Sequence, residues 1–170
     1  MRIRRRDVLK AVAATALAGF TQDAYADNRL PIPSEGKTAM TSRPLMTVKI
    51  AAAPPQKLGT VPHGIRSIVP VTGGDFEGPR LRGKVLPGGG DWLLLRPDGV
   101  LELDLRITLE TDDHALIYMT FQGLRHGSYF RTLPRFETST GTYAFLNRIV
   151  SVGVGEARPD GAVHRIDEIL

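Results

Sequence analysis

One carboxylate of this chain has the surroundings of an acid–base catalyst. Glu77 shares the parity of Leu81 and Val85 in a segment that alternates like a strand, provided that Gly78-Pro79 adds no bulge. A carboxylate that faces an apolar core has a raised pKa unless it is paired, which suits general acid–base catalysis. If a bulge shifts the parity, Glu77 faces water instead. The sequence allows both arrangements.

A second pair of charged residues lies further along the chain. Asp104 and Arg106 are two residues apart on the polar face of the alternating segment Val100 to Glu110. They form either a solvated ion pair on the surface or the inward groups of a ligand-lined barrel. In the second case Glu77 or Asp104 would move a proton, and Arg106 or Arg131 would stabilise an oxyanion.

Other candidates have simpler explanations beside the functional one. Trp92 and Tyr118 pack in a core or a hairpin, or close a pocket over an aromatic or aliphatic ligand. Arg131 and Glu137 flank the segment from Phe130 to Phe136, and they either belong to a pocket or pair with each other.

Several well-known chemical motifs are missing from the sequence. Gly88-Gly89-Gly90 lacks the Lys-Ser/Thr of a phosphate loop, and no nucleophile-elbow motif occurs. The chain has no cysteine, which excludes thiol catalysis, disulfides and cysteine zinc sites. We expect each of the scattered histidines to be a surface or turn residue: His63, His114, His126 and His164. The sequence therefore predicts no metal and no cofactor.

The charge of the chain is concentrated at its beginning. The 170 residues carry a net charge of +4, with 22 Lys and Arg against 18 Asp and Glu. Residues 1–26 hold 5 of the basic and 2 of the acidic residues, which leaves 17 against 16 in the rest of the chain. A general nucleic-acid binder needs a surface that neutralises phosphates, so we expect no nucleic-acid partner.

Residues 1–26 have the features of an export signal. Arg5-Arg6 precedes the mildly apolar run Ala11 to Phe20, and Ala24-Tyr25-Ala26 forms a small-x-small cleavage site. The order of residues resembles a twin-arginine signal, with Arg4 in place of the usual Ser or Thr. We therefore expect a periplasmic protein that begins near Asp27 and has no membrane span once the signal is removed. Residues 27–43 show no period and predict a flexible lead-in.

The remaining residues, 44–170, suit a single core, and they predict strands with little helix. The segment Gln122 to Thr140 is irregular and long enough to be a lid. Tyr143 to Leu146 predicts one helical turn. The expected strands are Leu45 to Ile50, Gly64 to Val71, Phe76 to Leu86, Trp92 to Arg96, Val100 to Glu110, Ala115 to Phe121, Arg148 to Glu156 and Val163 to Leu170.

This pattern predicts an all-β fold. A single antiparallel up-and-down β-barrel of about 8–10 strands is favoured over a β-sandwich, because closure removes exposed sheet edges. Arg96-Pro97-Asp98-Gly99 predicts a tight hairpin turn between two of the strands. Barrels of this size either fill with side chains or hold one small ligand.

Longer runs of the sequence resemble a known family. Residues 71–92, together with Thr111-Asp112-Asp113 and Tyr143-Ala144-Phe145-Leu146-Asn147-Arg148, are similar to the bacterial domain-of-unknown-function family 3237, also called uncharacterised protein family 0311. The resemblance implies a lipocalin-like barrel with no established activity. It also implies that His114 takes the place of a usual turn glycine. By resemblance, the pocket candidates are Glu77, Trp92, Asp104, Arg106, Tyr118, Arg131, Glu137 and Asn147.

These observations favour a barrel that binds a small, partly apolar molecule, oriented by Arg106 or Arg131. A metal-free isomerase, lyase or hydrolase is the alternative, with Glu77 or Asp104 as the acid–base group. A structural module without a ligand is the third. The sequence leaves homo-oligomer formation open.

Overall fold

The computed structural model describes residues 39–139 and 141–170 of the chain. The predicted export signal and residues 27–38 of the predicted lead-in lie outside the described residues. The first strand begins at Ser42, so Ser42 and Arg43 belong to the folded domain and not to the lead-in.

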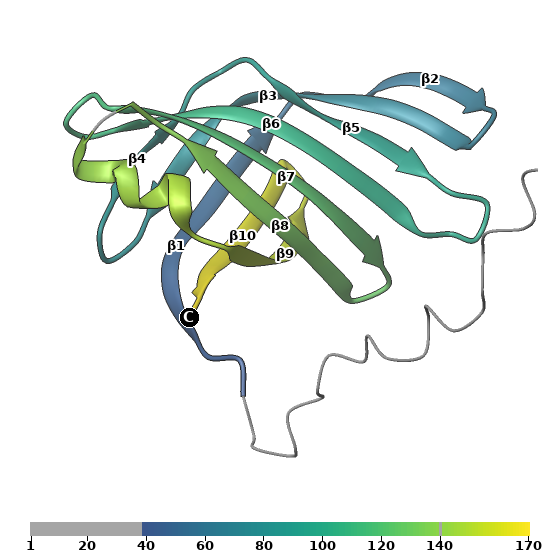
Figure 1. Ribbon diagram of the computed structural model, residues 1–170. Helices are drawn as coiled ribbons and strands as arrows, with labels where there is room; N and C mark the ends of the chain where they lie inside the picture. The colour runs from purple at the N-terminus through teal and green to yellow at the C-terminus, as the bar shows by residue number, and fades with distance from the viewer. Residues whose placement is uncertain (1–38, 140) are drawn as a thin grey trace, which may run out of the picture. The chain divides into compact units, whose positions relative to one another are not determined.

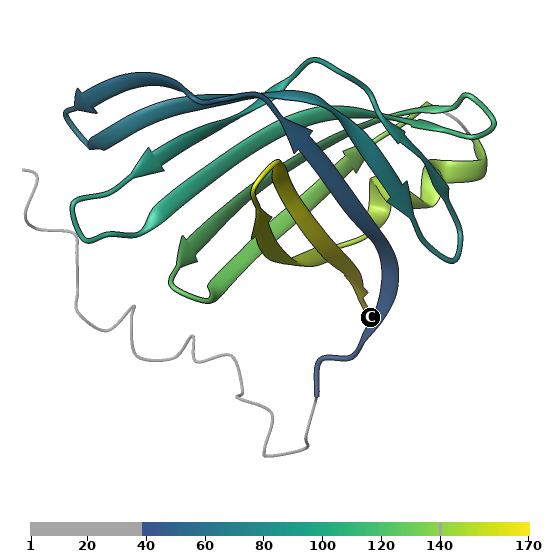
Figure 2. The ribbon, with the colours of Figure 1, turned by 180° about the vertical axis from the view of Figure 1, so that it is seen from behind.

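Strands make up most of the described part of the chain (Figures 1 and 2). A 3-10 helix, η2 (Gly141–Arg148), follows the eighth strand. The strands are β1 (Ser42–Ala52), β2 (Gln56–Val61), β3 (Gly64–Glu77), β4 (Arg82–Val85), β5 (Gly90–Leu95), β6 (Leu101–Thr111), β7 (Leu116–His126), β8 (Tyr129–Glu137), β9 (Ser151–Arg158) and β10 (Gly161–Ile169).

The sheet closes into an antiparallel barrel, as the sequence predicts. Consecutive strands pair from β6 to β10, and β1 pairs with both β10 and β3. The short strands β4 and β5 share the place between β3 and β6, each pairing with one part of these longer strands. β2 pairs with β3 alone and forms an edge beside the closed wall.

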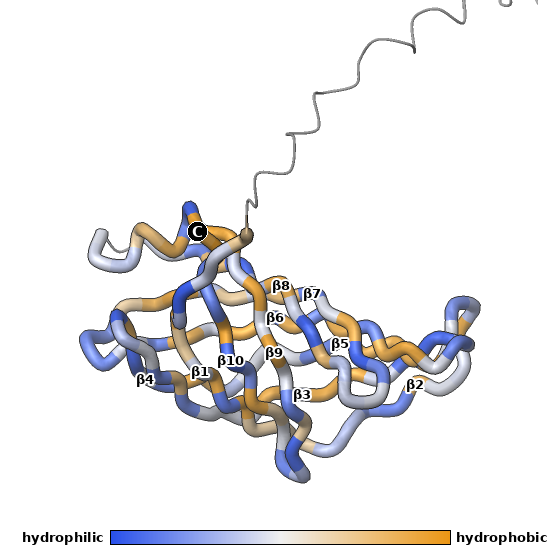
Figure 3. Tube along the Cα trace, turned by 90° about the horizontal axis from the view of Figure 1, so that it is seen from below, coloured by the Kyte–Doolittle hydropathy of each residue, from blue (hydrophilic) through white to orange (hydrophobic). Residues whose placement is uncertain are grey.

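Alternating side chains line the interior of the barrel. Leu103, Leu105, Ile107 and Leu109 of β6 are buried in the core, while residues of the opposite parity line the outside. β8 alternates in the same way, and Figure 3 shows hydrophobic and hydrophilic positions interspersed along the barrel wall. A strand directs successive side chains to opposite faces, so each wall segment supplies one apolar and one polar face.

The helix η2 covers one end of the barrel. Its Leu146 is buried in the core, and the hydroxyl of Tyr143 donates a hydrogen bond of 2.9 Å to Asp113. Asp113 belongs to the turn between β6 and β7, so this bond ties the helix to the barrel end. The predicted helical turn at 143–146 is confirmed and extends over Gly141–Arg148.

The predicted lid at Gln122 to Thr140 is wrong. β7 continues to His126, and β8 follows after a short turn. In β8, buried and more exposed side chains alternate. The buried ones are Phe130, Thr132, Pro134 and Phe136, so one inward position is a proline. Proline lacks an N–H and normally indicates an edge or an interruption. It is tolerated here because β9 pairs with β8 at Arg131–Val154 and Thr132–Gly153, away from Pro134.

Two predicted turns are confirmed. Gly99 takes a φ of +83° and its N–H donates to the carbonyl of Arg96, which closes the hairpin between β5 and β6. His114 has a φ of +64° in the turn between β6 and β7. The left-handed region normally favours glycine, so this histidine occupies a glycine-type position.

Candidate functional site

Asp91 of β5 points into the barrel. It lines the interior together with Leu93, whereas Trp92 between them lies on the outer face. The preceding Gly88-Gly89-Gly90 turn brings the chain against β6: a Cβ on Gly89 would lie 2.1 Å from the carbonyl oxygen of Arg106. Glycine at this position therefore allows β5 to start close to its neighbour.

The carboxylate of Asp91 takes part in the wall itself. β5 and β6 pair at Asp91–Leu105 and again at Leu94–Glu102, and no pairing is formed between these two positions. In this interval the Oδ1 of Asp91 accepts a hydrogen bond of 2.9 Å from the backbone N–H of Asp104. One carboxylate oxygen is thus held by the wall, and the other is left for the interior.

Burial changes the acidity of Asp91. The residue is 9% exposed. Loss of hydration raises its pKa to about 7, with the negative charge of Asp104 adding to the rise and the hydrogen bond from the Asp104 backbone opposing it. Near neutral pH Asp91 therefore exists in both its protonated and its ionised form.

His164 of β10 is the second buried titratable group in the interior. Its side chain is 1% exposed and packs between Phe121 and Phe130, with ring centroids 4.7 Å and 5.0 Å away. Burial lowers its pKa to about 4, so the imidazole is neutral at pH 7. Within the described residues, its Nδ1 has no hydrogen-bond partner.

Asp91 and His164 line the same cavity, of about 150 Å³. It lies away from η2, toward the ends of β7 and β9. The remaining lining is mostly apolar: Ile50, Ala52, Val69, Val71, Leu93, Leu101, Leu103, Leu105, Phe121, Phe130, Ala157, Gly161 and Ala162. An apolar cavity of about this volume holds a molecule the size of benzene.

Arg125 supplies the positive charge at this cavity. It is half-buried near the end of β7, opposite Leu101 on one side and Phe130 on the other. Its guanidinium carbon lies 5.7 Å from the centroid of the Phe130 ring. An anionic or carbonyl group of a molecule in the cavity would meet Arg125 at the mouth.

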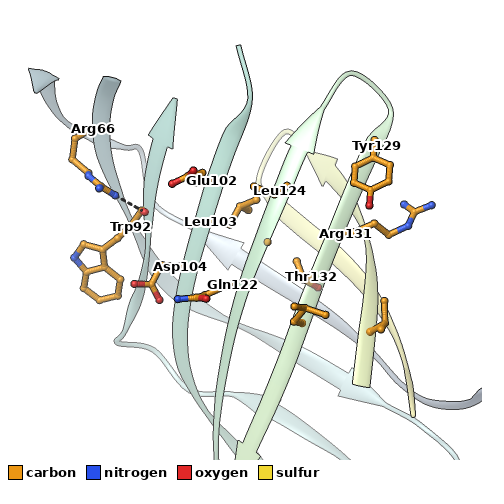
Figure 4. A pocket seen from close by; sticks show the side chains of 13 residues that line it. Arg66, Trp92, Glu102, Leu103, Asp104, Gln122, Leu124, Tyr129, Arg131 and Thr132 are labelled. Atoms are coloured by element: carbon orange, nitrogen blue, oxygen red, sulfur yellow. Dashed lines mark hydrogen bonds between the residues drawn. The ribbon is translucent and has the colours of Figure 1, made fainter. Parts of the chain in front are cut away.

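A larger groove of about 810 Å³ lies on the outer face of the sheet (Figure 4). Three residues predicted from the sequence line it: Trp92, Asp104 and Arg131. Asp104 forms a 3.0 Å ion pair with Arg106, whose guanidinium carbon lies 5.3 Å from the centroid of the Trp92 ring. Of the two arrangements open for Asp104 and Arg106, the structure has the surface ion pair.

The other predicted residues lie elsewhere on the outside. Tyr118, Glu137 and Asn147 share a cleft of about 280 Å³ near η2, where Asn147 exchanges hydrogen bonds with the backbone of Thr138. Glu77 is exposed and lines a separate cleft. The structure therefore does not bring Glu77 together with Asp104.

Arg131 and Glu137 do not pair with each other. They stand at opposite ends of β8, about 20 Å apart at the rise of an extended strand. Arg131 instead donates to the carbonyl of Phe130 and lies over the Tyr129 ring.

Asp91 and Arg125 are not among the residues predicted from the sequence, and the prediction of a surface or turn position for His164 is wrong. The sequence does contain a signal that His164 points inward: in β10 it lies two residues before Ile166, on the same face, and Ile166 is buried. Asp91 likewise shares the parity of Leu93. Both signals become readable only when the inward face of each strand is known.

Comparison with known proteins identifies the family. The family model described as "Protein of unknown function (DUF3237)" matches residues 40–129 and 126–169. The chain belongs to this family. A DUF3237 relative, a UPF0311 protein from Rhodopseudomonas palustris, is 33% identical over 130 residues, which cover 66% of this chain and 85% of the relative.

Solved structures agree with the barrel. A β-barrel-like protein from Acinetobacter baumannii has a TM-score of 0.75 at 34% identity, covering 77% of this chain and 96% of that chain. A protein of unknown function from Clostridium acetobutylicum has a TM-score of 0.73 at 29% identity, covering 77% and 99%. In the part of this DUF3237 chain that the structure describes, no helix is long and apolar enough to cross a membrane.

Proposed function

We propose that this protein binds a small, partly apolar molecule inside the barrel, with its anionic or carbonyl group at Arg125. The observation that carries this proposal is the interior cavity of about 150 Å³, whose mostly apolar wall also holds the buried Asp91 and His164. A guest that bonds to Asp91 or His164 gains affinity, because buried polar groups are costly unless they are hydrogen-bonded.

The lining supports a guest of mixed character. Most of the wall is apolar, and the polar groups Asp91, His164 and Arg125 are few. Ligand sites typically combine such walls with a small number of polar groups that orient the molecule. The volume suits one ring or a short branched chain. Arg125 takes the orienting role that the sequence analysis gives to Arg106 or Arg131, because those two arginines lie on the outer face.

The alternative mechanism with Glu77 or Asp104 as the acid–base group has no geometric support. Glu77 is exposed, and the Asp104 carboxylate pairs with Arg106 on the outer surface. Neither residue lines the interior cavity.

Thermal shift with cavity-sized probes tests the proposal. Benzoate, benzyl alcohol, hexanoate and toluene would be added to the purified domain, and a ligand that binds the native state raises its melting temperature by mass action. Arg125→Ala should lose the shift with benzoate and hexanoate but keep that with toluene. Arg131→Ala is the matched control, since it removes an arginine of the outer groove and should leave all shifts unchanged.

A variant that fills the cavity separates the interior from the outer groove. Ala162→Leu adds three carbons to the interior wall and should abolish every shift while the variant stays folded. If no probe raises the melting temperature of the natural chain, or if the shifts persist in Ala162→Leu, the proposal fails. The former result would favour a structural module.

We also infer that the protein is periplasmic. Arg5-Arg6, the apolar run that follows it and the site Ala24-Tyr25-Ala26 support export with cleavage before Asp27. N-terminal sequencing of the protein from a periplasmic extract should begin near Asp27. Mature protein that begins at Met1 would contradict this inference.

A further inference from the structure

We propose that the interior cavity is a proton-transfer site, in which Asp91 removes a proton next to a substrate carbonyl and His164 stabilises the resulting enolate. The substrate class is a small cyclic or branched ketone with an acidic C–H beside the carbonyl. This inference rests on the proposed function, because it requires that the cavity admits a small molecule.

The geometry places both groups at one guest. Asp91 reaches the cavity from β5 and His164 from β10, with Leu105 and Phe121 among the residues of the wall between them. The backbone N–H of Asp104 holds one oxygen of Asp91, which fixes the carboxyl and leaves the second oxygen for the guest. The rings of Phe121 and Phe130 hold the imidazole in one orientation.

The two groups also have matching protonation states. Asp91 has a pKa of about 7, so at neutral pH it can accept a proton and return it. His164 has a pKa of about 4 and stays neutral, so its N–H can donate a hydrogen bond to an oxyanion without giving up the proton. A carboxylate base beside a neutral imidazole is an established pattern for enolisation.

The step balances without any further reactant. The Asp91 carboxylate takes the proton as the C–H bond breaks, and the electron pair of that bond forms the C=C bond of an enolate. The charge moves to the carbonyl oxygen, where the N–H of His164 and the cation of Arg125 stabilise it. Protonated Asp91 then exchanges its proton with solvent and returns a solvent proton to the same carbon. With a β,γ-unsaturated ketone it delivers the proton to the γ-carbon, which gives the conjugated isomer.

Deuterium exchange tests this chemistry without knowledge of the natural substrate. Cyclopentanone and cyclohexanone would be incubated with the protein in D₂O at pD 7, and loss of the protons beside the carbonyl followed by NMR. The protein should accelerate exchange over buffer. Asp91→Asn should slow the protein-dependent rate by about 10²- to 10⁴-fold, the usual range for a general base. Glu77→Gln, which changes an exposed carboxylate, is the matched control and should exchange at the full rate.

The role of each group has its own readout. Asp104, Arg125 and His164 are the ionisable groups around Asp91. The exchange rate should rise with pH and level off above a midpoint near 7, and Asp91→Asn should remove this midpoint. His164→Gln keeps an N–H and should retain more activity than His164→Phe, which removes it.

Binding measurements separate the two proposals. Thermal shift and NMR shift changes would show whether the ketones bind to the natural chain and to Asp91→Asn, and circular dichroism would show that each variant is folded. If a ketone binds but exchanges no faster than with Asp91→Asn, the proton-transfer inference is overturned and the binding function stands. If none of the ketones or the earlier probes binds, both proposals fail together.

Discussion

The Oδ1 of Asp91 accepts a 2.9 Å hydrogen bond from the backbone N–H of Asp104, at a place where β5 and β6 are not paired. The side chains of these two aspartates end on opposite sides of the barrel wall. Asp104 meets Arg106 on the outside, whereas Asp91 is buried inside. The same residue type thus forms a surface ion pair in one case and is buried with a raised pKa in the other.

Asp91→Asn should make the protein more stable at alkaline pH. Asp91 titrates near pH 7 in the folded chain, against an ordinary value of 3.8. The folded state therefore binds more protons between these values, and natural stability falls as the pH rises through them, by at most roughly 4 kcal/mol. Asparagine keeps an oxygen for the N–H of Asp104 and has no proton to lose.

Urea unfolding at pH 5, 6, 7 and 8 measures this effect. The free energy of unfolding of Asp91→Asn, relative to the natural chain, should increase from pH 5 to pH 7 and level off toward pH 8. Glu77→Gln provides the control at an exposed carboxylate. Parallel pH dependences of Asp91→Asn and the natural chain would contradict the buried position of Asp91.

His164→Phe should protect the fold against acid. The pKa of His164 is lowered to about 4, whereas an unfolded histidine binds its proton near its ordinary value of 6.5. The natural chain therefore loses stability from this group as the pH falls from about 6.5 to 4. Phenylalanine keeps an aromatic ring beside Phe121 and Phe130 and cannot be protonated. Chemical unfolding at pH 7 and pH 4.5 should show a smaller loss for the variant, and an equal loss would refute the prediction.

Thr132→Val should leave stability unchanged or raise it by up to about 1 kcal/mol. The hydroxyl of Thr132 is buried and has no hydrogen-bond partner among the described residues. Valine has almost the same shape and removes this unsatisfied group. Gly153→Ala tests the same place by adding an atom to it, because a Cβ on residue 153 would lie 2.2 Å from the Thr132 hydroxyl. We expect Gly153→Ala to cost about 1–3 kcal/mol by thermal unfolding. Marked destabilisation by Thr132→Val would mean that the hydroxyl is bonded.

His114→Val should destabilise the protein by about 1–2 kcal/mol, whereas His114→Gly should stay within about 1 kcal/mol of the natural chain. His114 has a φ of +64°, which a β-branched residue adopts only with strain. Its ion pair with Glu110 adds little, because the His114 side chain is highly exposed. Urea unfolding of both variants measures the difference, and equal stabilities would argue against the left-handed turn.

More of the fold than of the candidate site could be predicted from the sequence. The alternation over Val100 to Glu110 predicts β6, and the Gly and Pro turns predict the meander. β8 was missed because Pro134 interrupts an otherwise regular pattern. The expected strands also leave out β2, Gln56–Val61. The fold class depends on many weak signals that agree, so two missed strands do not change it.

The site depends on which way single side chains point. Glu77 was judged from the parity of Leu81 and Val85, but the strand ends at Glu77 and a new one begins at Arg82. Parity does not carry across such a break. The His164 ring packs against Phe121 and Phe130, which belong to other strands. Contacts of this kind are set by closure of the barrel and are not visible in a single sequence.

The helix η2 blocks one end of the barrel, where Leu146 is buried in the core and Tyr143 is bonded to Asp113. A molecule bound in the proposed site would therefore enter and leave at the opposite end. Substitutions in the loops at that opposite end would then change ligand selection, while the η2 end continues to maintain the fold.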